Sequence, residues 1–302
     1  MTEDVVRVES TAFRPAKRIV TQCRAQTLCT RDVLRRGLES PPAGTPCRAD
    51  LEHAKSATAQ RTILSAMSAH LSASSFAIES MAQSIELHFA SDTFLAVPTL
   101  VVTRALLEYA ATAAWILDPQ VSADQRLARN CAASIRAVER SVRELGPDFD
   151  GGKFQATRES LLNYYVAAGV DVQYFVDPKT NSVRREVRSV RVGTARAAIN
   201  YNISQRISKQ IQIGDVYGIL SSVAHGEQVA IAMTSVSIET QLRAIAFACF
   251  RSVEAYSTAV HAYVGAVPGG FINPQDLQDL LATFPHDVQE RRAANARRFG
   301  GD

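Results

Sequence analysis

Polar residues at even spacing stand out in the segment YGILSSVAHGEQ, residues 217–228. Tyr217, Ser221 and His225 follow one another at intervals of four, so a helix would place them on one face. On such a face the histidine can act as a general base or proton relay, and the tyrosine as an acid or hydrogen-bond donor. The G-x-S-x-G pattern of serine hydrolases is missing, so nucleophilic serine chemistry is not predicted. The alternative is a packed helix whose histidine is satisfied within the core.

A charged pair interrupts the apolar segment TRALLEYAATAAWILDP, residues 103–119. Arg104 and Glu108 are four residues apart and would share a helix face, with Trp115 seven residues further along that face. Burying charges in such a helix is costly unless they are paired or hydrogen-bonded. Two interpretations stay open: a polar network that locks the register of neighbouring helices, or a functional pocket.

Two further arginines, Arg126 and Arg129, lie near the start of the next predicted helix, beside Asn130. Positive charge at a helix N-terminus is unfavourable with the helix dipole. An acidic partner would remove the conflict, and Glu108 or Asp118 on the preceding helix could serve. A bound anion such as phosphate would remove it too, because helix N-termini and arginines both favour anions.

An acidic stripe is predicted on an earlier helix, where Glu79, Gln83 and Glu86 share a face. Two carboxylates at this spacing can hold a divalent ion only if a third ligand arrives, and a solvated face is the simpler interpretation. The sequence lacks a P-loop, a G-x-G-x-x-G, an H-E-x-x-H and a paired Cys/His set. We therefore predict no metal site, and the sequence indicates no particular cofactor.

The composition is that of a folded globular protein. The chain has 302 residues, 46% hydrophobic and 21% charged, with a net charge of +3. That balance is too even to indicate nucleic-acid or membrane binding by bulk electrostatics. Five cysteines without a C-x-x-C pair indicate a reducing compartment. The polar N-terminus and the lack of a long apolar run predict neither a signal peptide nor a membrane span. We expect a cytoplasmic protein with no membrane partner.

The apolar periodicity predicts a mainly all-α fold, a multi-helix bundle of about eight to ten helices with one β-hairpin insertion. Helices are expected over most of residues 48–168, with Ser122 as an N-cap, and again near Thr194, near Ile213 and over 235–264. Period-two alternation around the sequence DPKTN predicts the hairpin, at about 170–192.

Composition shifts divide the chain into three predicted parts. Residues 1–46 form an N-terminal arm with a short helix at about 17–37, and residues 47–267 form the helical core including the hairpin. Residues 268–302 form short C-terminal helices and a basic tail.

Three of these segments together resemble a family of uncharacterised bacterial all-helical proteins. The shared pattern reads R-x3-E, W-x-L-D-P, R-x2-R and Y-x3-S-x3-H-G, and it covers about residues 100–230. The matching positions are Arg104, Glu108, Trp115, Asp118, Pro119, Arg126, Arg129, Tyr217, Ser221, His225 and Gly226. The resemblance implies a helical bundle and no particular biochemical function.

The same pattern is distantly similar to HEPN-like helical bundles, several of which are ribonucleases or toxin components. Those ribonucleases carry an arginine a few residues before their histidine. In this sequence Gly218, Ile219 and Leu220 stand in that place. Ribonuclease activity by that motif is therefore not expected.

Our leading hypothesis is a small anionic molecule bound or transformed by acid–base chemistry in a pocket among three helices. His225, Tyr217 and Glu108 would act on protons. The predicted substrate-binding residues are Arg104, Arg126, Arg129, Ser221 and Trp115.

Three alternatives stay open. In the first, a basic hairpin with Arg184, Arg185, Arg188 and Arg191 binds nucleic acid in a HEPN-like toxin, defence or regulatory protein. The second is a non-standard isoprenoid cyclase, suggested by size and class although the Asp-rich motifs are missing. The third is a helical scaffold with a register-setting polar network. A homo-oligomer is expected.

Overall fold

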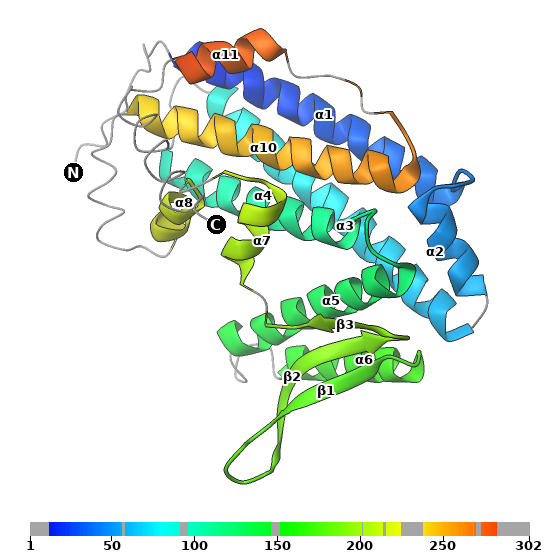
Figure 1. Ribbon diagram of the computed structural model, residues 1–302. Helices are drawn as coiled ribbons and strands as arrows, with labels where there is room; N and C mark the ends of the chain where they lie inside the picture. Colours follow the sequence, from blue (N-terminus) through cyan, green and yellow to red (C-terminus); the bar gives the residue numbers. More distant parts are fainter. Residues whose placement is uncertain are drawn as a thin grey trace, which may run out of the picture.

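The computed structural model confirms a mainly helical fold with a small β-sheet (Figure 1). It describes residues 12–55, 58–90, 96–145, 152–200, 202–213, 216–224, 238–267, 269 and 273–282. In that part of the chain there are ten helices and one three-stranded antiparallel sheet. His225, Gly226 and most of the predicted basic tail lie outside the described residues.

Four long helices form the main bundle. Each of the four packs against two of the others: α1 on α10, α10 on α4, α4 on α3, and α3 on α1 (Figure 1). Their bounds are α1 Phe13–Glu39, α3 Thr58–Ala90, α4 Ala96–Ile116 and α10 Ile238–Val264. The apolar face of α3 is buried along its whole length, at Ile63, Met67, Leu71, Ile78, Ala82, Ile85 and Phe89. Burial of this stripe explains why the sequence periodicity located the helix.

Helix α1 is longer than the helix predicted within the N-terminal arm, and it belongs to the bundle. Ile19, Val20 and Cys23 are completely buried between α10 and α3. The many arginines of α1 led to the prediction of an arm, but they lie on the face opposite the apolar stripe and along its edges. A helix with an apolar stripe and a basic face packs its stripe inward and keeps its charges near solvent.

Helix α4 lies at the centre, in contact with α10, α3, α8, α7 and α5. Leu106, Leu107 and Ala110 are completely buried. The apolar residues of this segment pack against these neighbours over most of the helix surface. Val97, Val101 and Tyr109 form an exposed flank.

A second layer consists of α5 Ala123–Leu145, α6 Lys153–Ala167 and the sheet (Figure 1). Helix α5 contacts α6, β2 and β3 on one side, and α3 and α4 on the other. Ser122 caps it as predicted, since its Oγ accepts a hydrogen bond from the Gln125 N–H at 3.2 Å. This helix therefore joins the bundle to the sheet.

The predicted hairpin is present, as β1 Asp171–Val176 and β2 Val183–Val192. Asp177 Oδ1 accepts the Lys179 N–H at 2.9 Å and so closes the turn. The helix predicted near Thr194 is wrong: β3 Ala195–Ala198 pairs with β2 instead. A turn at Gly193, whose φ is +54°, returns the chain to the edge of β2, and cross-strand pairing there outweighs the helix propensity of ARAA.

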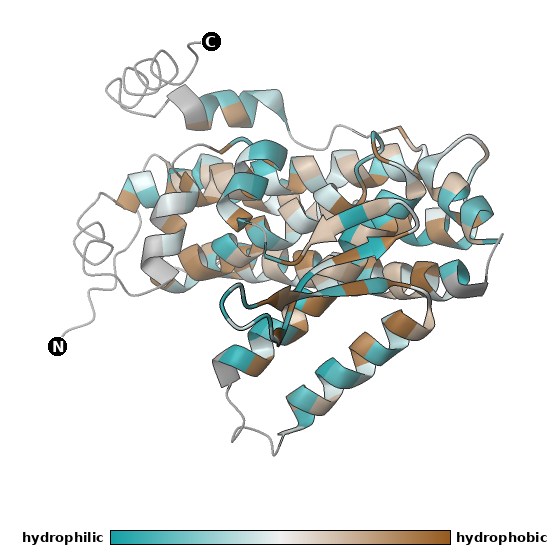
Figure 2. Ribbon diagram, turned by 60° about the horizontal axis from the view of Figure 1, so that its bottom comes forward, coloured by the Kyte–Doolittle hydropathy of each residue, from teal (hydrophilic) through white to brown (hydrophobic). Residues whose placement is uncertain are grey.

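Four shorter helices complete the fold: α2 Pro46–Lys55, α7 Ile203–Gln210, α8 Val216–Ala224 and α11 Pro274–Ala282. Asn202 caps α7 by accepting the Ser204 N–H at 2.9 Å. Both α7 and α8 pack on α4, and α11 packs on α1. Hydrophilic and hydrophobic residues alternate along the outer helices and the strands (Figure 2). In the described part of the chain, the helices are too short or too polar to cross a membrane.

Candidate functional site

A cleft of about 590 Å³ opens between α3, α4 and α5, with Ile203 of α7 at its edge. Its polar lining comes from all three of the longer helices. Helix α3 contributes His70 and Ser74, α4 contributes Arg104, Glu108 and Thr112, and α5 contributes Arg136, Arg140 and Ser141. Two of the predicted site residues, Arg104 and Glu108, therefore line a cavity.

Glu108 is the centre of a hydrogen-bonded network. Its Oε1 accepts a hydrogen bond from Arg104 Nε at 2.9 Å and another from the Tyr217 hydroxyl at 3.0 Å. Arg104 also lies over the Tyr217 ring, 5.9 Å from its centroid. Burial of the phenol, and then the negative charge of Glu108, raise the pKa of Tyr217. Tyr217 thus stays a hydrogen-bond donor, and it connects α8 to α4.

Ser221 contributes its backbone to this network. Its carbonyl oxygen lies 3.5 Å from Arg104 Nη1, at the limit of a hydrogen bond. Four residues further on, His225 lies outside the described residues. Only Tyr217 and Ser221 of the evenly spaced set are therefore placed beside Arg104 and Glu108.

The charges of the cleft are unbalanced. Arg140 Nη1 lies 3.9 Å from Glu108 Oε2, on the other side of the carboxylate from Arg104 and Tyr217. The residues that line the cleft include three arginines, Arg104, Arg136 and Arg140, and one carboxylate, Glu108. The lining therefore has a surplus of two positive charges, which favours anions.

His70 is a polar residue of the cleft that the sequence analysis missed. Its Nδ1 lies 2.6 Å from Asn130 Oδ1 and 3.4 Å from Ser134 Oγ. Burial lowers the pKa of His70, and the hydrogen bond to Asn130 opposes that shift. The imidazole is therefore neutral at pH 7. An amide oxygen only accepts, so Nδ1 carries the proton and Nε2 is left as an acceptor.

Arg136 and Arg140 were also missed, although the sequence contains a signal for them. They recur at spacings of seven and eleven from Arg129, which marks one face of the amphipathic helix α5. Basic residues on such a face are usually solvated, and only the packing of α5 across α3 and α4 turns this face into a cleft wall.

Arg126 lies elsewhere, contrary to the prediction that it joins Arg104 and Glu108. Its Nη2 and Nε bind Asp50 at 2.6 and 2.9 Å. Tyr263 donates to the same carboxylate at 3.1 Å. Arg126 and Asp50 have only 3% and 0% of their side chains exposed, and Arg126 also donates to the carbonyl of Asp118 at 3.3 Å. The acidic partner comes from α2, and this arginine belongs to a closed structural network.

Arg129 and Trp115 form a third cluster, and neither residue lines the cleft. Arg129 Nη1 donates to the Trp115 carbonyl at 2.6 Å and to Asp118 Oδ2 at 3.2 Å. Its guanidinium lies 5.0 Å from the centre of the Trp115 ring, which Arg206 also covers at 3.5 Å. Asp118 is therefore the acidic partner of Arg129, as predicted. Arg129 also satisfies the Trp115 carbonyl at the C-terminal end of α4.

The acidic stripe of α3 pairs with α1. Arg24 binds Glu86 at 3.0 Å and Arg31 binds Glu79. From the first pair to the second, the chain advances by seven residues on α1 and goes back by seven on α3. The two helices are therefore antiparallel. Among the described residues, no three His, Cys, Asp or Glu side chains gather closely enough to hold a metal ion.

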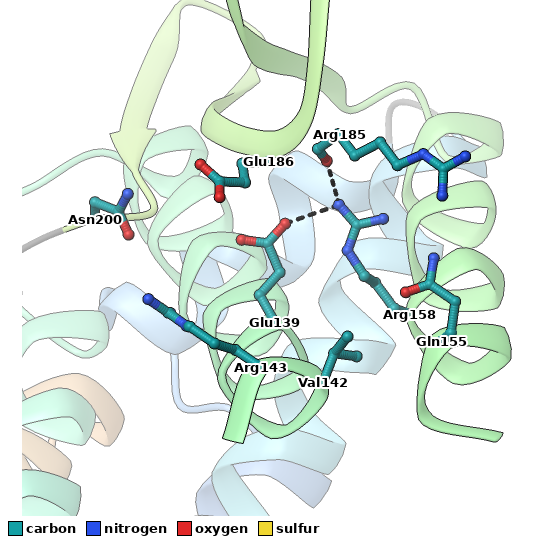
Figure 3. Close-up of a pocket in the computed structure, with 8 residues that line it drawn as sticks. All are labelled: Glu139, Val142, Arg143, Gln155, Arg158, Arg185, Glu186 and Asn200. Carbon is teal, nitrogen blue, oxygen red and sulfur yellow. Dashed lines mark hydrogen bonds and ion pairs between the residues drawn. The ribbon is translucent and has the colours of Figure 1, made fainter. Parts of the chain in front are cut away.

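A smaller hollow of about 260 Å³ lies between α5, α6 and β2 (Figure 3). Glu139 and Arg158 meet there at 2.9 Å, and Arg158 also donates to the carbonyl of Arg185. Glu139 accepts the Val187 N–H at 3.2 Å as well. These bonds join the hairpin to α5 and α6, so Glu139 and Arg158 serve the packing of the second layer.

Part of the hairpin charge is neutralised. Arg184 binds Asp177 at 3.0 Å, and Arg191 binds Asp171 at 2.8 Å. Arg188 is exposed on β2. The positive surface predicted for nucleic acid is thus weaker than the count of arginines implies.

Comparison with known proteins finds no match to a protein-family model, to a curated protein or to a solved structure. The resemblance to HEPN-like bundles therefore stays a prediction.

Proposed function

We propose that this protein binds a small anionic molecule in the cleft between α3, α4 and α5. The observation that carries the proposal is the charge of the lining, which contains three arginines and one carboxylate. A volume of about 590 Å³ is in the range of small-molecule sites. An anion of this size would compensate the surplus charge of the walls.

The network around Glu108 supports this function by holding the arginine wall in place. The side chain of Arg104 is 14% exposed and is fixed by Glu108, which Tyr217 fixes in turn. A guanidinium already held in its binding position loses little conformational entropy when a ligand arrives. Arginine also presents a planar fork of donors that matches phosphate and carboxylate groups.

Isothermal titration of the full chain with inorganic phosphate, pyrophosphate and citrate tests the proposal. We expect saturable binding of at least one anion, weakened by salt. Arg140→Gln should weaken it tenfold or more, because a hydrogen bond to a charged group contributes about 1.5–3 kcal/mol.

Arg184→Gln is the matched control for this experiment. Arg184 and Arg140 are 55% and 50% exposed and each lies beside a carboxylate, but Arg184 lies on the hairpin. The control variant should bind like the wild type. Equal losses in both variants, or no saturable binding of any of the three anions, would overturn the proposal.

A short single-stranded RNA in low-salt buffer serves as the competing ligand. If RNA binds and Arg184→Gln or Arg188→Gln weakens it more than Arg140→Gln does, the hairpin is the contact surface and the cleft proposal is wrong. We expect the opposite order, because Arg140 lines a cleft with two further arginines, whereas Arg184 is paired with Asp177 on the hairpin.

A further inference from the structure

The cleft has two chemically different ends. Arg104 and Arg140 flank Glu108 at one end, and Arg136 lies one turn earlier on α5. The other end is neutral, with His70 and Ser74 of α3 and Thr112 of α4. Arg104 and Thr112 are eight residues apart on α4, so the two ends are about 12 Å apart along the helix.

The neutral end presents acceptors. The hydroxyl of Thr112 donates its hydrogen to the Glu108 carbonyl at 2.8 Å, which leaves only lone pairs for a ligand. His70 donates from Nδ1 to Asn130, which leaves the Nε2 lone pair. A ligand group that binds to Thr112 or to His70 must therefore supply a hydrogen-bond donor, such as a hydroxyl group.

Asn130 holds His70 in this orientation. It is completely buried, and its Nδ2 has no hydrogen-bond partner in the part of the chain that the structure describes. Buried polar atoms are rarely left in that state. The amide is a positioning group: its oxygen accepts a hydrogen bond from Nδ1–H and so selects this tautomer of His70, which leaves Nε2 as an acceptor on a residue that lines the cleft.

The charged end suits a dianion. The lining has two more positive than negative charges, and a phosphate monoester carries a charge of about −1.5 to −2 at pH 7. We infer that the ligand of this cleft is a hydroxyl-bearing phosphate monoester, with its phosphate between Arg104, Arg136 and Arg140 and a hydroxyl donating to His70. The inference rests on the proposed function and adds the class of ligand.

Sugar phosphates and nucleoside monophosphates share this chemistry, and calorimetry separates them. Inorganic phosphate, ribose 5-phosphate and adenosine monophosphate are titrated separately into the full chain. We expect at least one of the esters to bind roughly tenfold more tightly than inorganic phosphate, because the extra hydrogen bonds form only with the ester.

His70→Phe keeps a ring but removes the acceptor. This variant should lose the preference for the ester while its affinity for inorganic phosphate changes less than about twofold. Thr112→Val is the second variant, because it keeps the shape of the side chain and should reduce the same preference. It decides the question if His70→Phe does not fold.

The outcomes separate the inference from the proposed function. If no anion binds, both fail. If inorganic phosphate binds but neither ester binds more tightly, or if the preference survives in His70→Phe and Thr112→Val, the proposed function stands and the phosphate-ester inference is wrong. Nitrogen NMR of His70 adds a direct test, since the protein must show the Nδ1–H tautomer, and the Nε2 signal must shift with the ester but not with inorganic phosphate.

Discussion

Two arginine–carboxylate pairs, one buried and one half-buried, differ in their surroundings in this molecule. Arg126 and Asp50 are enclosed, with 3% and 0% of their side chains exposed, and Tyr263 completes their hydrogen bonds. Arg104 and Glu108 are 14% and 20% exposed and border a cleft with two further arginines. Each pair has a tyrosine hydroxyl bound to its carboxylate. Burial of a charge therefore does not identify a site; surplus charge beside an open volume does.

The largest expected effect is on the enclosed pair. Arg126→Met leaves the Asp50 carboxylate buried without its cation, and removing one partner of a buried pair costs about 3–5 kcal/mol. Urea unfolding measures the loss. The double variant Asp50→Leu/Arg126→Met should recover part of it, because both charges are gone. A loss below about 1 kcal/mol would place this pair in the class of surface ion pairs.

Arg104→Met should have a smaller effect on stability and a large effect on binding. Glu108 keeps the Tyr217 hydroxyl and the nearby Arg140, so we expect a loss of about 1–2 kcal/mol in unfolding free energy. Anion affinity should fall tenfold or more. If Arg126→Met at a temperature where it is folded weakens anion binding equally, the distinction between the two pairs is wrong.

The two tyrosines provide a matched comparison. Tyr263→Phe and Tyr217→Phe each remove one hydroxyl from a carboxylate. We expect the Tyr263 change to cost about 2 kcal/mol and the Tyr217 change about 1 kcal/mol, because a donor lost from a more buried carboxylate is less easily replaced by water. Thermal and urea unfolding measure both; equal costs would show that the cleft is as dry as the core.

His70 makes stability depend on pH. Its pKa is lower in the folded than in the unfolded chain, so the unfolded chain binds the proton first as the pH falls. Above the pKa of His70 in the unfolded chain, His70 does not affect stability. As the pH falls from that pKa to the lower pKa of the folded chain, the free energy of unfolding decreases. His70→Gln should lose less stability than the wild type between pH 7 and pH 5 in urea unfolding. Parallel curves for the two proteins would contradict this.

The smallest effect is expected at the hairpin. Arg184→Gln removes one exposed ion pair and should change the unfolding free energy by less than about 0.5 kcal/mol. This variant sets the baseline against which the cleft and core changes are measured in the same unfolding experiment.

Local features were predictable because they depend on spacing along one element. The apolar stripe of α3, the Ser122 cap and the DPKTN turn follow from helix and turn geometry over a few residues. The third strand was not predictable from its own residues, because ARAA favours a helix and only the edge of β2 makes it a strand.

Three polar residues of the cleft, His70, Arg136 and Arg140, could likewise not be predicted from the sequence, because they lie in separate segments. His70 is sixty residues from Asn130 in the chain, so the sequence does not show that the two side chains meet. Within α3, His70 lies next to Met67 and Leu71 of the apolar stripe, and its position there does not suggest a site. Arg136 and Arg140 have the pattern of a solvated face. Such residues become a site only when α5 packs across α3 and α4.

By itself, the sequence determined which charges are close along one helix. Arg104 and Glu108 meet because four residues make about one helical turn, whatever surrounds them. Tertiary structure decided everything that joins distant segments: Asp50 as the partner of Arg126, Tyr217 on Glu108, and the volume beside three arginines. Those contacts depend on how whole helices pack, and packing is settled by the apolar faces of all of them together.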